Sequence, residues 1–249
     1  MRQKKFFISI LFLLFNLQLG FTSPLKDGLK EKNLIKNYYQ KLLLNNKNLQ
    51  LPSESVFEIA MTGYLNLKGS SQINSSKELL SIIDFSKKSS EKRYWLIDLK
   101  SNKVLYHSLV AHGRNTGFDI AKHFSNTPSS YRSSLGFYTT GKTYYGKHGL
   151  SLYLHGKDKG FNDKAKERAI VMHGASYVSE QFVKLHGRLG RSLGCPALPM
   201  SNYKEIINNI KEGTCLFIYY PSQDYLQNST VLTNGGEVNQ ANYITQLNE

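Results

Sequence analysis

A cysteine in the segment GRLGRSLGCPALP, residues 187–199, has surroundings that suit chemistry better than packing. Cysteine is usually a small buried apolar residue, yet Cys195 stands between Gly194 and Pro196 in a stretch without helical or strand periodicity. A thiolate attacks carbonyl carbon atoms, and a neighbouring histidine can create it by taking the proton. Glycine lets a backbone approach a substrate, so the amides of Gly194 and Cys195 could stabilise the resulting oxyanion. The segment therefore predicts a cysteine nucleophile.

Among the seven histidines, His155 in YLHG and His173 in VMHG each end an apolar run and directly precede a glycine. A histidine can take a thiol proton and return it later, provided that a third group fixes its tautomer. A strand end holds such a side chain rigidly and leaves it open on one side. His173 is nearer to Cys195 in the sequence, but spacing alone does not choose between the two histidines.

The second cysteine, Cys215, leaves two hypotheses open for Cys195. Cys215 lies in GTCLFIYYP, a continuous apolar run that is typical of a buried strand. In an oxidising compartment the two cysteines could form a disulfide. The alternative is an inert, buried Cys215 and a free, reactive Cys195.

The elements that must position these residues read mainly as short strands. Runs rich in Ile, Leu, Val and Tyr alternate with polar turns from about residue 79 onward. Many short strands with few helices predict a mainly β domain over residues 79–223, a sandwich or open barrel with a few peripheral helices. The strands are expected at 79–86, 93–99, 103–113, 137–146, 150–156, 167–174 and 215–221.

The N-terminal part predicts an export signal followed by helices. Residues 1–23 have a basic start and an apolar stretch too short for a comfortable membrane span, which is typical of a signal peptide. Its cleavage site is poorly defined, so an uncleaved segment that associates with the membrane is the alternative. Residues 24–78 are expected to form a helical extension. Within it, 53–67 has an apolar stripe at helical spacing, with Ser55 and Glu58 as a capping box.

The C-terminal part predicts one more helix and a tail. Residues 201–213 carry an isoleucine stripe at helical spacing, with Ser201 as the expected N-cap. Residues 224–249 are polar and lack periodicity, so we expect them to be disordered.

The formal net charge of +14 suits polyanionic surroundings such as a cell wall, a phospholipid surface or nucleic acid. The basic segment 86–93, SKKSSEKR, is not interleaved with aromatic residues, so the pattern does not favour a nucleic-acid partner. A metallopeptidase is disfavoured because the sequence contains no HExxH and the histidines lack a convincing carboxylate partner. We therefore expect no metal. Nothing in the sequence indicates an oligomeric state.

The stretch IVMHGASYVSEQFVKLHGRLGRSLGCPALP, residues 170–199, resembles the catalytic region of the murein L,D-transpeptidase family. That family carries a His-Gly pair and, after a gap, Ser-x-Gly-Cys. The similarity runs from about Leu80 to Tyr220, and it covers the SLGC form of the motif. It implies a β-sandwich-like catalytic domain in the periplasm or cell envelope, acting on peptidoglycan stem peptides without metal or organic cofactor.

The resemblance also implies a role for each matching residue. Cys195 becomes the nucleophile, and His173 becomes the general base and later the general acid. The main-chain carbonyl of Gly174 orients the imidazole, while Ser192 and Gly194 shape the nucleophile loop. A cysteine with this role cannot be tied to another, so the resemblance disfavours the disulfide.

Two positions depart from the better-known branch of the family. Leu193 stands where that branch has histidine. Ala197 stands where an arginine or asparagine helps to bind the substrate carboxylate, so that role is vacant here. Arg188 or Arg191 could take the role, and a solvated surface position is the alternative for both.

The reaction that the resemblance implies is acyl transfer through a cysteine thioester. The thiolate would attack the carbonyl that joins the L-centre of diaminopimelate to D-alanine in a tetrapeptide stem. An amine of a second stem would then resolve the thioester and form a 3→3 cross-link. The alternative is an L,D-carboxypeptidase, in which water resolves the same thioester. A wall-binding module without catalysis is a further hypothesis.

Overall fold

The computed structural model describes residues 24–233. The predicted export signal, 1–23, and the last part of the predicted tail, 234–249, lie outside the described residues. No helix in the described part is both long and apolar enough to cross a membrane.

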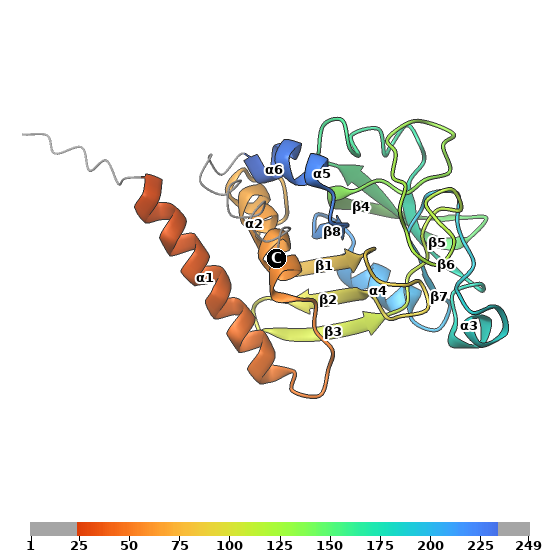
Figure 1. Ribbon diagram of the computed structural model, residues 1–249, viewed down its shortest axis with the longest axis horizontal. Coiled ribbons are helices and arrows are strands. Elements are labelled where there is room, and N and C mark those ends of the chain that lie inside the picture. The colour runs from red at the N-terminus through yellow and green to blue at the C-terminus, as the bar shows by residue number, and fades with distance from the viewer. Residues whose placement is uncertain (1–23, 234–249) are drawn as a thin grey trace, which may run out of the picture.

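The core of the fold is one sheet of eight strands in the order β3-β2-β1-β8-β4-β5-β6-β7 (Figure 1). Neighbouring strands run antiparallel except β1 with β8 and β6 with β7, which are parallel. The strands are β1 (Leu79–Asp84), β2 (Tyr94–Asp98), β3 (Lys103–Ser108), β4 (Gly136–Gly146), β5 (Gly149–Gly156), β6 (Val171–Ala175), β7 (Ala197–Pro199) and β8 (Cys215–Tyr219).

The sheet curls until its two edges nearly meet. Ala111, just beyond the edge strand β3, pairs with Ala197 on the opposite edge strand β7. The amide of Ala111 donates to the carbonyl of Ala197 at 2.9 Å, and the reverse bond measures 3.3 Å. The fold is therefore mainly β and resembles a nearly closed barrel, which confirms the predicted fold class.

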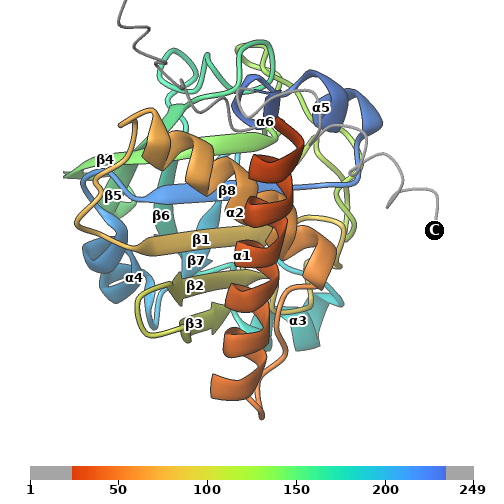
Figure 2. The same ribbon diagram turned by 90° about the vertical axis from the view of Figure 1, so that its left-hand side faces the viewer.

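Six helices in the described residues surround this sheet, and the two N-terminal ones share its core. Helix α2 contacts β1, β8 and α6, and α1 packs along α2 and β3 (Figure 2). Leu42 of α1, Phe57 of α2 and Leu80 of β1 belong to one buried cluster. The N-terminal helices are thus part of the folded unit. The helices are α1 (Pro24–Asn45), α2 (Glu54–Gly69), α3 (Glu180–His186), α4 (Tyr203–Ile210), α5 (Gln223–Asn228) and α6 (Thr230–Thr233).

Both predicted N-caps are wrong by one or two residues. Helix α2 begins at Glu54, and the hydroxyl of Ser53, not of Ser55, accepts the amide of Val56 at 3.3 Å. Helix α4 begins at Tyr203 after Asn202, whose side chain makes no capping bond, so Ser201 is not the cap.

The prediction that the tail is disordered from residue 224 is wrong for its first ten residues. Helices α5 and α6 form there because apolar side chains find a place in the core. Tyr225 and Leu226 of α5, with Val231 and Leu232 of α6, are all buried. The hydroxyl of Tyr225 also donates to buried Asp158 at 3.0 Å.

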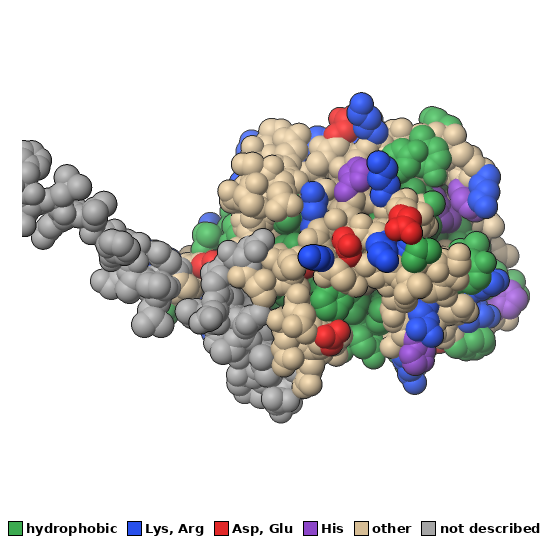
Figure 3. All heavy atoms as spheres, turned by 90° about the horizontal axis from the view of Figure 1, so that it is seen from above, with side chains coloured by type: hydrophobic (Ala, Val, Ile, Leu, Met, Phe, Trp, Pro, Cys, Tyr) green, Lys and Arg blue, Asp and Glu red, His purple; other side chains and the backbone are tan. Residues whose placement is uncertain are grey.

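Both cysteines are free thiols, Cys215 buried in β8 and Cys195 partly exposed. The alternative of a disulfide is therefore excluded by the structure. Basic side chains are more widespread than acidic ones on the face that Figure 3 shows, in keeping with the formal net charge of +14.

Candidate active site

The parallel strands β6 and β7 bring the two predicted catalytic residues to neighbouring places on the sheet. His173 of β6 pairs in register with Ala197 of β7. Cys195 precedes that partner by two residues, which is about 7 Å along a strand. Strand β7 has only three residues and no sequence periodicity, so the sequence did not predict it.

The His173 ring is held by its own neighbour in the chain. Its Nδ1 lies 2.9 Å from the carbonyl oxygen of Gly174. A carbonyl only accepts hydrogen bonds, so Nδ1 carries the proton and Nε2 keeps a free lone pair. Burial lowers the pKa of His173, the bond to Gly174 opposes this, and the charges of His148 and Lys147 lower it further. The ring is therefore a neutral base at neutral pH.

Gly174 is needed because a tyrosine ring lies against its backbone. A Cβ added at Gly174 would stand 2.6 Å from ring atoms of Tyr203, which is buried at the start of α4. Carbon atoms pack at about 3.5–4.0 Å, so only glycine fits without displacement. This close approach fixes the carbonyl that orients His173.

The thiol of Cys195 faces the backbone at the beginning of β6. Its Sγ accepts the amide of Val171 at 3.5 Å and donates to the carbonyl of Ala169 at 3.7 Å. Among the contacts of residues 24–233, none joins Sγ to His173. A change of χ1 rotamer moves a sulfur atom by about 3 Å, and catalytic hydrogen bonds are often made only with substrate bound.

Burial raises the pKa of the Cys195 thiol, and nearby dipoles and charges oppose this shift. The amide of Val171, the charges of Arg168 and Lys147, and the amide of Cys195 itself all lower the pKa. The net direction is upward, so the thiol needs a base to ionise near neutral pH.

The hydroxyl of Ser192 closes the nucleophile loop, residues 187–196 between α3 and β7. This hydroxyl accepts the amide of Gly194 at 3.0 Å and donates to the carbonyl of Cys195 at 2.6 Å. Gly194 has a φ of +128°, which favours glycine, and its carbonyl accepts the hydroxyl of Ser133 at 3.0 Å. The expectation that the Gly194 amide faces an oxyanion is therefore corrected, because that amide binds Ser192. The amide of Cys195 is the remaining candidate of the two.

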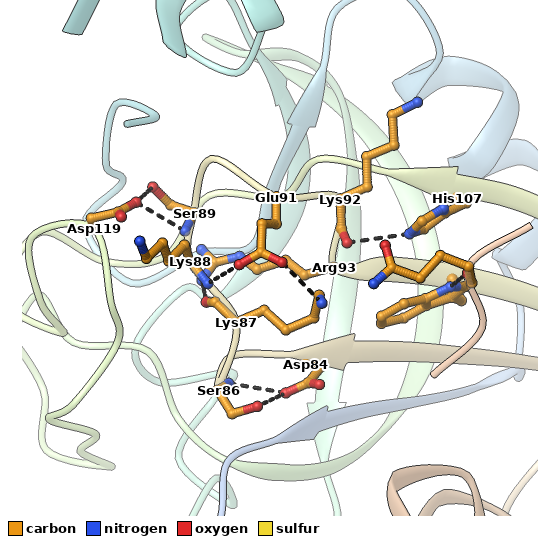
Figure 4. Close-up of polar contacts among 12 residues, drawn as sticks. Asp84, Ser86, Lys87, Lys88, Ser89, Glu91, Lys92, Arg93, His107 and Asp119 are labelled. Atoms are coloured by element: carbon orange, nitrogen blue, oxygen red, sulfur yellow. Dashed lines mark hydrogen bonds and ion pairs between the residues drawn. The ribbon is translucent and has the colours of Figure 1, made fainter. Parts of the chain in front are cut away.

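Buried polar groups anchor the start of this loop. The hydroxyl of Ser89 donates to Asp119 at 2.8 Å (Figure 4). The same hydroxyl accepts the amide of Leu189 at 3.1 Å. The carbonyl of buried His112 accepts the amide of Ser192 at 2.9 Å. The basic segment 86–93 thus supports the site, and its Lys87 pairs with Glu91 at 3.0 Å within the same segment.

Arg168 is a functional candidate that the sequence reasoning missed. Its guanidinium donates to the carbonyls of Arg132 at 2.6 Å and Ser125 at 2.7 Å, and to the hydroxyls of Ser130 and Ser134. It therefore holds the 125–134 loop beside the nucleophile loop. The only signal in the sequence is a basic residue shortly before the AIVMHG run.

Arg188 and Arg191, the candidates for carboxylate binding, both pack on Phe118. Their guanidinium carbons lie 4.2 and 5.2 Å from its ring centroid. Arg191 also donates to the carbonyls of Arg114 and Gly117, each at 3.1 Å. Arg188 donates to the carbonyl of Leu189 at 2.7 Å. Protein groups therefore occupy at least one donor of each arginine.

His148 is a second residue that the sequence reasoning missed. Its ring stacks on that of His173, with centroids 4.4 Å apart and planes 20° apart. It stands with Lys147 in the turn between β4 and β5. His155, the other candidate partner from the sequence, lines a surface hollow with Lys142 on the β4–β5 hairpin. The structure thus favours His173 over His155 as the partner of Cys195.

The arrangement combines a thiol, a neutral imidazole of fixed tautomer and nearby positive charge. These groups can perform acyl transfer to sulfur, with the imidazole moving the proton. No cluster of three or more His, Cys, Asp or Glu side chains in the described residues could hold a metal ion.

Residues 48–219 match the sequence model of a protein family, the L,D-transpeptidase catalytic domain. The match includes all eight strands and the segment from His173 to Cys195. It begins before the expected domain boundary at residue 79, so helix α2 lies inside the matched region. A search of curated proteins gave no match.

Several solved structures show a distant likeness. An L,D-transpeptidase from Mycobacterium smegmatis has 12% identity and a TM-score of 0.36, covering 57% of this chain and 59% of its own. An L,D-transpeptidase from Xylanimonas cellulosilytica has 12% identity and a TM-score of 0.34, covering 75% and 93%. The helical cell shape determining protein Pgp2 from Campylobacter jejuni has 13% identity and a TM-score of 0.35, covering 56% and 46%. This chain thus spans less than two thirds of the mycobacterial and Campylobacter chains.

Proposed function

This chain belongs to the L,D-transpeptidase catalytic-domain family, and we propose that it cross-links peptidoglycan stem peptides through Cys195 and His173. The family match over residues 48–219 carries the proposal. The parallel pairing of β6 with β7 supports the choice of residues, because it makes the histidine strand and the cysteine loop neighbours. The predicted export signal in residues 1–23 would deliver the enzyme to the periplasm or cell envelope.

The first half of the reaction forms a thioester. Nε2 of His173 takes the proton from Cys195, and the sulfur attacks the carbonyl carbon between diaminopimelate and D-alanine. The amide of Cys195 stabilises the oxyanion. When the C–N bond breaks, the imidazolium gives its proton to the leaving nitrogen. D-alanine departs as a free amine, and the acyl group remains on sulfur.

The second half transfers the acyl group to an amine of another stem. His173 takes a proton from the attacking amine, the new amide bond forms, and the proton returns to the sulfur. The product is a 3→3 cross-link. Water in place of the amine would release a tripeptide instead.

The supporting residues keep these groups in place. Gly174 holds the imidazole through its carbonyl, and Ser192 and Gly194 give the nucleophile loop its shape. Helices α1 and α2 share a buried core with the sheet, so the extension 24–78 supports the 79–223 unit mechanically.

The test is product analysis with a purified disaccharide-tetrapeptide. The protein should release D-alanine and produce a cross-linked dimer, whereas Cys195→Ala should produce neither. Tripeptide without dimer would show a carboxypeptidase and refute the transfer step. Release of D-alanine by Cys195→Ala would refute the nucleophile.

A further inference from the structure

The turn between β4 and β5 places two exposed residues beside the candidate active site. Gly146 and Gly149 are the last paired residues of the hairpin, so Lys147 and His148 form its tip. Gly149 has a φ of +73°, the left-handed conformation that commonly closes such a turn. Both tip residues are exposed to solvent.

Two contacts hold this turn against the catalytic histidine. The His148 ring stacks on His173 with centroids 4.4 Å apart. On the other side, the hydroxyl of Tyr203 lies so close to Gly149 that a Cβ added there would stand 3.0 Å from it. The same tyrosine packs its ring on Gly174. The turn is therefore fixed to the backbone that positions His173.

Lys147 brings a positive charge to the reacting groups. Its charge acts on both the His173 ring and the Cys195 thiol, and lowers the pKa of each. The two ion pairs in the described residues are Lys68 with Glu78 and Lys87 with Glu91, and neither uses Lys147. A solvent-exposed ammonium without an acidic partner, in a turn that packs on the His173 ring, can bind an anionic group of a substrate.

The chemistry of the donor peptide supplies such a group at this place. In a peptide that ends one residue after the scissile bond, the leaving nitrogen and the terminal carboxylate are bonded to the same Cα atom. His173 must reach that nitrogen to protonate it, so the carboxylate lies within a few ångströms of the imidazole. Ala197 offers no charge, and both Arg188 and Arg191 pack on Phe118. Lys147 directly precedes His148, whose ring stacks on the imidazole.

We propose that Lys147, in the turn that His148 holds against His173, binds the terminal carboxylate of the donor peptide. The turn would thereby restrict the enzyme to bonds one residue from a free C-terminus. This inference rests on the proposed function and adds the group that selects the donor.

The experiment compares two donors that differ only at this carboxylate. A disaccharide-tetrapeptide with terminal D-alanine and its C-terminal amide are incubated with the full-length protein, and kcat/KM is measured from release of the terminal residue. The wild type should prefer the free acid about 10- to 100-fold, the range of a charge-assisted hydrogen bond. Lys147→Gln should lose most of that preference, because its kcat/KM on the free acid should fall far more than its kcat/KM on the amide. Lys147→Arg should restore the preference in part.

Lys142→Gln is the matched control, because Lys142 is an exposed lysine of the same hairpin. It should keep the wild-type preference. The subsite is refuted if Lys147→Gln keeps the preference, if the wild type uses both donors equally, or if Lys147→Gln slows both donors alike. Loss of the preference in Arg188→Gln or Arg191→Gln alone would assign the carboxylate to the arginine instead. Absence of an acyl adduct with either donor would refute the proposed function itself, a different outcome from an adduct formed without preference.

Discussion

Substitution of Gly174 by alanine tests how the backbone positions the base. The new Cβ would lie 2.6 Å from the Tyr203 ring, so one of the two must move by about 1 Å to reach van der Waals distance. Tyr203 is buried in the core and cannot yield freely. Overpacking of this kind costs about 1–3 kcal/mol of unfolding free energy. A displacement of about 1 Å at the carbonyl that holds His173 should slow acylation about 100-fold.

The assay pairs urea unfolding with the rate of acyl-enzyme formation. Tyr203→Ala alone leaves a cavity and should lower the unfolding free energy by about 3–5 kcal/mol. In the double variant, Gly174→Ala with Tyr203→Ala, the clash is absent. Its loss of unfolding free energy should therefore be about 1–3 kcal/mol smaller than the sum of the losses in the two single variants. Gly69→Ala is the control, because a Cβ there meets nothing within 4 Å. Additive losses would show that the new Cβ does not clash with Tyr203, and acylation of Gly174→Ala at the wild-type rate would show that this backbone does not position His173.

Three further substitutions follow from the site. Arg168→Gln removes several charged hydrogen bonds, so urea unfolding should show a loss of about 2–4 kcal/mol of unfolding free energy. It should also raise the pKa of the Cys195 thiol and thereby slow its alkylation. An unchanged stability and alkylation rate would contradict the role of Arg168 in holding the 125–134 loop beside Cys195. His148→Phe keeps a stacked ring but removes a charge that lowers the pKa of His173. The pKa of His173 should therefore rise. Because acylation needs neutral His173, the acid limb of its pH–rate profile should move to higher pH in this variant. A limb that stays in place or moves to lower pH would show that His148 does not lower the pKa of His173. Cys215→Ala should leave alkylation of the native protein unchanged, since burial raises the pKa of Cys215 and hides it from reagent; loss of a labelled site by mass would show otherwise.

The sequence predicted the residues that lie in regular, periodic segments. Runs rich in Ile, Leu, Val and Tyr gave the mainly β class. His173 lies in a strand as expected, but in the middle of β6 (Val171–Ala175) and not at its end. The apolar run around Cys215 is a buried strand in the structure. These signals are local, so they survive without knowledge of the tertiary fold.

What the sequence did not predict depends on contacts between distant segments. Strand β7 is defined by its pairing with β6 and with Ala111, not by its own three residues. Arg168 and His148 take their significance from the 125–134 loop and from His173, which only folding brings near them. The helices after residue 222 form because a few apolar side chains reach the core, a signal that their polar neighbours conceal.

The most direct test of the account is the rate at which an acyl group appears on Cys195, followed by intact mass and peptide mapping. With a tetrapeptide donor, the wild type should gain the mass of the acyl-tripeptide on the peptide that contains Cys195. His173→Gln should form the same adduct at least about 100-fold more slowly, because general-base catalysis of this kind contributes about 10²–10⁴-fold. An adduct on any other residue, or one formed by His173→Gln at the wild-type rate, would contradict the account.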